Sequence, residues 1–172
     1  MNGIIKECET RVRRTYRGGA LLDVFLGRQR GTDGFFPEDW ISSFVEAKNR
    51  DYIPGEGITR LEDGRLITDA VGGGMFGQGR TEPGVLIKLL DSGERLGIQV
   101  HPTDAYAKKL FGSDYGKTES WHVLSTRRIN DEEPKVYLGF KPGLTRELWT
   151  EYYRTQNVNA MLNALHEIPV KP

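Results

Sequence analysis

Cysteine, an excess of charge of either sign and long apolar runs are all scarce or missing in this chain. Of its 172 residues only Cys8 is a cysteine, so no disulfide can form within the chain and a structural zinc knuckle is excluded. Lys and Arg together number 24, as do Asp and Glu, which gives a formal net charge of zero. This balance argues against a nucleic-acid-binding protein, whose surface carries a basic excess.

The apolar stretches are too short for a membrane helix, which needs roughly 20 apolar residues. Near the N-terminus, Ile4 and Ile5 are followed at once by Lys6, so we expect no signal peptide and no membrane partner. A single cysteine suits a reducing compartment, and the expected location is the cytoplasm. The length suits one domain over residues 1–172. The 21 glycines and 10% aromatic residues are typical of a β-rich protein with many turns.

Alternating apolar residues and turn residues predict short strands through the middle of the chain. The expected strands cover residues 39–47, 85–90, 96–101, 119–126 and 135–140, with a hairpin connection at residues 91–94. A short helix is expected over residues 105–111, with Thr103 as its N-cap and Gly112 at its end. The glycine-rich stretch at residues 71–79 predicts a surface loop.

The pattern becomes helical at about residues 144–166. Leu148 and Tyr152 lie four residues apart on one apolar face, and a second apolar face follows from Val158. His166 is expected on the second of these two helices.

Two segments near the middle of the chain carry the residue types of a metal site. Side chains at positions i and i+2 of a strand share a face, so Gln99 and His101 are expected to point the same way, as are Lys117 and Glu119. An imidazole, a carboxylate and an amide oxygen on adjacent strands form three arms of a divalent-metal site, with Zn²⁺ as the first expectation. By residue type alone, a histidine bonded to a neighbouring glutamate is the commoner arrangement, and both interpretations stand. His122 alternates away from this face.

The amino-acid sequence of these two segments resembles that of a known family. Gln-x-His-Pro at residues 99–102, followed by Gly-Lys-Thr-Glu at residues 116–119, closely resembles the type I mannose-6-phosphate isomerases of the cupin superfamily. Residues 85–91 resemble the strand that precedes this motif in the family, and residues 37–43 resemble its early Trp-Ser segment.

The resemblance implies a mainly β fold: a cupin barrel (a double-stranded β-helix or jelly roll) with a pair of inserted or appended helices. It implies an enzyme of carbohydrate metabolism that interconverts mannose 6-phosphate and fructose 6-phosphate, a phosphosugar substrate and one Zn²⁺ per site. Gln99, His101 and Glu119 would bind the metal, Lys117 would contact substrate or transfer a proton, and Lys88 would contact the substrate phosphate. Trp40 and Trp121 are expected in the core, although either could line a sugar pocket.

The chain also departs from the family pattern. A histidine on a later strand completes the family's metal site, and none is found here at a matching position, so we expect an N-terminal part of a longer isomerase. On its own such a part is expected to be inactive and to self-associate through unpaired strand edges. Gly97 stands where the family usually has a serine that contacts phosphate. The alternatives are a non-catalytic cupin domain that binds a sugar or other ligand, an isomerase for another sugar and, last, a metal-dependent oxygenase.

Overall fold

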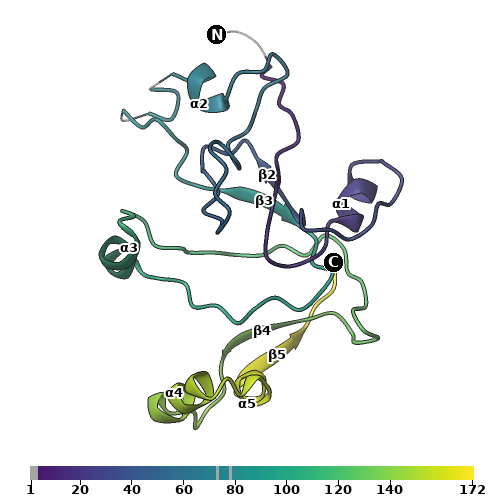
Figure 1. Ribbon diagram of the computed structural model, residues 1–172, viewed down its shortest axis with the longest axis vertical. Coiled ribbons are helices and arrows are strands. Elements are labelled where there is room, and N and C mark those ends of the chain that lie inside the picture. The colour runs from purple at the N-terminus through teal and green to yellow at the C-terminus, as the bar shows by residue number, and fades with distance from the viewer. Residues whose placement is uncertain (1–3, 73, 78) are drawn as a thin grey trace. The chain divides into compact units, whose positions relative to one another are not determined.

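The computed structural model describes residues 4–72, 74–77 and 79–172, and the chain divides into two compact units, Met1–Gly97 and Ile98–Pro172 (Figure 1). The described residues form five strands, in two antiparallel sheets, and five helices. The first unit contains β1 (Arg11–Val12), α1 (Ala20–Phe25), β2 (Glu38–Ile41), α2 (Ile67–Ala70) and β3 (Ile87–Leu90), and the second contains α3 (Asp104–Phe111), β4 (Lys135–Phe140), α4 (Arg146–Arg154), α5 (Val158–Asn163) and β5 (Leu165–Pro169). Among these residues, no helix has both the length and the apolar character needed to cross a membrane.

A three-stranded sheet in the order β1-β2-β3 organises the first unit. Its core packs Val12, Trp40 and Ala47 together, with the half-buried Leu86 against them. Trp40 also packs on Gly57, where an added Cβ would lie 2.7 Å from a ring carbon. A second apolar cluster surrounds α2 and contains Leu61, Ile67, Ala70 and Val71.

A buried carboxylate lies in this sheet. The side chain of Glu38 is only 3% exposed, and it accepts hydrogen bonds from the Tyr16 hydroxyl at 2.5 Å and the Trp40 indole at 2.7 Å. Arg14 Nε lies 3.2 Å and Lys88 Nζ 3.6 Å from its oxygens. Burial raises the pKa of Glu38, but these hydrogen bonds and positive charges outweigh it, so the net pKa lies below the usual value.

The second unit is built from α3 and from a two-stranded sheet, β4–β5, whose strands are joined through α4 and α5 (Figure 1). A side chain caps the N-terminus of each of these two helices. Leu148 N donates to Thr145 Oγ1 at 3.2 Å, and Ala160 N donates to Asn157 Oδ1 at 3.1 Å. The rings of Phe140 and Trp149 meet edge to face, with centroids 4.8 Å apart.

Several expected elements are present. The strand expected at residues 85–90 is β3, that at 135–140 is β4, and that at 39–47 is shortened to β2. The short helix is α3, with Thr103 as its N-cap and Gly112 in the left-handed conformation at its C-cap. The expected loop at residues 71–79 includes Gly73 and Gln78, which lie outside the described residues.

Other expectations are wrong. Residues 96–101 and 119–126 form no strand; they are irregular chain on either side of α3, and no strand pairing joins them to a neighbouring backbone. The sheet partner of β3 is β2, so residues 91–94 do not join two paired strands. His166 belongs to β5, because pairing with β4 takes over directly after α5. The described residues close no barrel, and the cupin fold stays a prediction.

The buried carboxylate leads to a stability prediction. A carboxylate whose pKa is lowered by folding stabilises the protein above the unfolded-state pKa, and this stabilisation is lost as the pH falls through the folded-state pKa. Glu38→Gln is expected to lower the free energy of unfolding by about 1–3 kcal/mol at pH 7, because two cations lose their buried partner. Urea unfolding from pH 7 to pH 3 measures the difference between wild type and variant, which should shrink below about pH 4.5.

Glu62→Gln is the matched control, because Glu62 is exposed and lies 3.8 Å from an exposed lysine, Lys6. It should change the free energy of unfolding by less than about 0.5 kcal/mol. Equal effects of the two substitutions would show that the Glu38 carboxylate has no special role in stability.

Candidate functional site

Three of the predicted site residues lie together in the second unit, around the carboxylate of Glu119. His101 Nε2 is 3.3 Å from Glu119 Oε2, and Lys117 Nζ is 3.5 Å from the same oxygen. The Glu119 side chain is 20% exposed, that of His101 32% and that of Lys117 45%. The structure thus brings His101 and Lys117 to Glu119, and all three side chains are partly exposed to solvent, whereas the role of Gln99, His101 and Glu119 as metal ligands stays a prediction.

Helix α3 and its flanking segments bring the cluster together. The chain leaves His101, forms α3, turns at Gly112 and returns so that Lys117 N donates to Pro102 O at 3.0 Å. Gly116 N donates to the side chain of Asp104 at 2.7 Å. A Cβ at Gly116 would lie 2.5 Å from Pro102 O, closer than real contacts allow, so glycine is required for this approach.

The spacing of the His101 and Glu119 donor atoms suits a metal ion. Zinc binds nitrogen and oxygen donors at about 2.0–2.2 Å, and a tetrahedral angle then places two donors roughly 3.3–3.5 Å apart. The observed separation of 3.3 Å falls in this range, and it equally fits the direct histidine–glutamate pair. In the described part of the chain, no group of three or more His, Cys, Asp or Glu side chains is arranged to hold a metal ion. A third protein ligand would therefore be of another type, and the exposed Gln99 is the predicted one.

Lys88, the predicted phosphate contact, lies in the first unit on β3. Its ammonium is 3.6 Å from the buried Glu38 and 6.0 Å from the centre of the Trp40 ring, and its side chain is 18% exposed. Arg14 and Tyr16 contact the same carboxylate. The structure thus pairs Lys88 with a buried carboxylate that Arg14 and Tyr16 share, and the role of Lys88 toward a substrate stays a prediction.

The sequence reasoning missed Glu38 as the residue that holds Lys88. The signal was present, since Glu38 and Trp40 lie two residues apart on one strand and share a face, and Lys88 is opposite Trp40 in the register of β2 and β3. Trp40 is buried at 6% exposure, as predicted, whereas Trp121 is 60% exposed and its prediction as a core residue is wrong, because its segment forms no strand that could be covered.

The close approach at Gly116 leads to a prediction. Gly116→Ala is expected to cost about 1–3 kcal/mol of local stability, because the added methyl group must push Pro102 away. Amide hydrogen exchange measures this effect at Lys117 N–H, whose bond to Pro102 O should open more often. Gly97→Ala is the matched control, since a side chain there would meet no atom within 4 Å. Unchanged exchange at Lys117 in Gly116→Ala would contradict the close approach.

Comparison with known proteins shows similarity to isomerases. The chain is 33% identical over 97 residues to the "Probable mannose-6-phosphate isomerase GmuF" of Bacillus subtilis (strain 168), which covers 56% of this chain and 28% of that protein. It is 39% identical over 64 residues to a mannose-6-phosphate isomerase of Streptococcus mutans, covering 37% of the chain and 19% of that protein. It is 31% identical over 88 residues to the mannose-6-phosphate isomerase ManA of Bacillus subtilis, covering 51% and 25%.

No family model matches the chain, and no solved structure matches it. The matched regions span between about a fifth and just over a quarter of the length of these relatives. Over part of its length, the chain is therefore related in sequence to the mannose-6-phosphate isomerases.

Proposed function

We propose that this chain contributes to the activity of a metal-dependent aldose–ketose isomerase, an enzyme that interconverts mannose 6-phosphate and fructose 6-phosphate. The observation that carries the proposal is the cluster of His101, Lys117 and Glu119, whose side chains meet at 3.3 and 3.5 Å. The sequence similarity to three proteins named as mannose-6-phosphate isomerases supports the same reaction.

The reaction requires removal of a proton next to a carbonyl group, its return to the neighbouring carbon, and stabilisation of the negative charge that develops on oxygen. When bound by Gln99, His101 and Glu119, a Zn²⁺ ion supplies positive charge close to these oxygens. Lys117 provides a second positive charge, which Glu119 holds at 3.5 Å, and it can bind a substrate oxygen or transfer a proton. Lys88 contacts the substrate phosphate in this proposal.

A non-catalytic domain that binds a sugar or other ligand is the second candidate, and a cupin barrel would suit either role. Two observations favour it: the described residues bring no third His, Cys, Asp or Glu to the cluster, and Gly97 offers no hydroxyl to a phosphate. Because Gly97 lacks the hydroxyl that contacts phosphate, it is also consistent with an isomerase that acts on a different sugar. A coupled isomerase assay on the protein expressed from its complete gene separates catalysis from binding alone.

A cytoplasmic location and self-association belong to the same proposal. Each strand of the two-stranded sheet β4–β5 has an outer edge that another strand could join. Light scattering of the purified chain measures the association, and a monomer at all concentrations would contradict it.

Metal binding gives a prediction that distinguishes the two histidines of this region. His101→Ala is expected to weaken Zn²⁺ binding by at least about 100-fold, because it removes a direct ligand, whereas His122→Ala leaves binding unchanged. Elemental analysis of the dialysed proteins, with competition against a zinc chelator, measures the affinities. Equal loss in both variants, or full metal content in His101→Ala, would contradict the proposed ligand set.

A second prediction concerns Lys117. In the protein expressed from its complete gene, Lys117→Met is expected to lower kcat for mannose 6-phosphate about 100-fold or more, because it removes the positive charge and the exchangeable proton but keeps the length of the side chain. Lys108→Met is the matched control, since Lys108 is an exposed lysine paired with an exposed aspartate, Asp114. An equal kcat in Lys117→Met and Lys108→Met would contradict the role of Lys117, and binding of the sugar phosphate without turnover by the complete wild-type protein would favour the non-catalytic candidate.

A further inference from the structure

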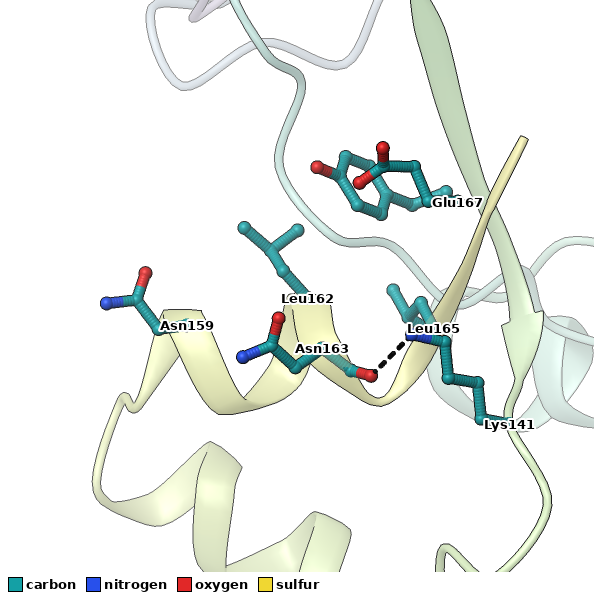
Figure 2. Close-up of a pocket in the computed structure, with 7 residues that line it drawn as sticks. Lys141, Asn159, Leu162, Asn163, Leu165 and Glu167 are labelled. Carbon is teal, nitrogen blue, oxygen red and sulfur yellow. Dashed lines mark hydrogen bonds between the residues drawn. The ribbon is translucent and has the colours of Figure 1, made fainter. Parts of the chain in front are cut away.

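A pocket in the second unit shares no residue with the His101 cluster. It has a volume of about 390 Å³ and lies between α5 and the β4–β5 sheet (Figure 2). This volume falls in the range of pockets that hold small molecules, about 300–1,000 Å³. The lining residues are Tyr137, Lys141, Asn159, Leu162, Asn163, Leu165 and Glu167.

The amide groups of this pocket come from one face of α5. Asn159 and Asn163 are one helical turn apart, and Figure 2 shows their side chains on the side of the helix from which Leu162 also projects. Each amide offers two donors and one acceptor oxygen. A hydroxyl group is both a donor and an acceptor, so two adjacent amides suit a ligand with several hydroxyl groups.

The charges of the lining cancel. Lys141 Nζ donates to the backbone oxygen of Asn163 at 3.0 Å, and Glu167 lies 3.4 Å from Lys135 Nζ. One cation and one anion therefore line the pocket, and each already has a partner within the unit. Neither a phosphate nor a cationic ligand would find an excess of opposite charge here, so the chemistry favours an uncharged ligand.

The pocket also offers apolar surface. Leu165 is buried at 7% exposure, Leu162 is half-buried, and the ring of Tyr137 contributes a phenolic hydroxyl beside an apolar face. These apolar side chains lie beside the amide groups of the asparagines. Such a lining suits a sugar ring, which has C–H groups on its face and hydroxyl groups around its edge.

We propose that this pocket binds a neutral polyhydroxylated ligand of monosaccharide size. The proposal rests on the lining of the pocket and does not depend on the isomerase activity. Hydroxyl groups of the ligand bond to Asn159, Asn163 and Glu167, while its C–H face packs on Leu162 and Tyr137.

The test is an NMR titration of the ¹⁵N-labelled chain with D-glucose, and separately with inorganic phosphate. Saturable shifts at the amides of Asn159, Leu162 and Asn163 are expected, with a Kd of roughly 1–10 mM for so small a ligand. Phosphate should cause no saturable shift at these residues. Absence of saturation up to 100 mM glucose and 100 mM D-mannose would overturn the proposal, as would tighter binding of phosphate than of glucose in this pocket.

Variants separate this pocket from the proposed isomerase site. Asn159→Leu combined with Asn163→Leu is expected to weaken glucose binding at least 10-fold, and leucine preserves the helix. His101→Ala should leave the glucose-dependent shifts on α5 unchanged. Shifts centred on His101 and Glu119 instead of α5 would assign the sugar to the other site and overturn the inference. If the double variant fails to fold, the map of wild-type shifts alone decides.

Discussion

The first unit depends on the hydrogen bonds and ion pairs that the buried carboxylate of Glu38 makes. This carboxylate ties three separate parts of the chain together: Arg14 and Tyr16 from the N-terminal segment, Trp40 from its own strand, and Lys88 from β3. Burying a carboxylate is costly unless hydrogen bonds and opposite charges compensate. Here they more than compensate, since the pKa of Glu38 lies below its usual value although burial raises it. The sheet and the buried Trp40 are thus arranged around a charge that needs hydrogen-bond and ion-pair partners.

The second unit depends on a steric constraint rather than on a buried charge. The absence of a side chain at Gly116 lets the chain pass close to Pro102, and the hydrogen bond from Lys117 N holds it there. This contact brings Glu119 to His101 although neither residue belongs to a strand. The chemistry of the cluster, an imidazole and an ammonium on one carboxylate, therefore follows from the geometry of a short helix and its return.

The cluster and the pocket on α5 differ in the ligands that they favour. The cluster places an imidazole and an ammonium within 3.5 Å of one carboxylate, which suits a metal ion and the charged oxygens of a substrate. The pocket offers amides, a phenol and leucines with no net charge, which suits an uncharged ring. Both lie in the same unit and use different elements, so binding at each can be measured separately.

Local sequence signals determined several elements of this protein. Gly112 ends α3 in the left-handed conformation, whereas Thr103 stands at the N-cap position without a side-chain hydrogen bond to the helix, and the apolar runs at residues 85–90 and 135–140 contain β3 and β4. The motif around His101 and Glu119 contains the residues that lie within 3.5 Å of one another or of Lys117 in the folded chain, and their function stays a prediction. Parity along a strand does not explain how Lys117 and Glu119 lie, because these residues form no strand.

Only the tertiary structure decided the rest, because it depends on partners that are distant in the sequence. Whether residues 96–101 and 119–126 become strands depends on a neighbouring backbone to pair with, and the fold pairs neither segment in a ladder. His166 follows helical spacing, yet pairing with β4 makes it part of β5. The sequence alone does not name a partner for Lys88. In the folded sheet the register of β2 and β3 pairs Lys88 with Trp40, and its ammonium lies 3.6 Å from Glu38.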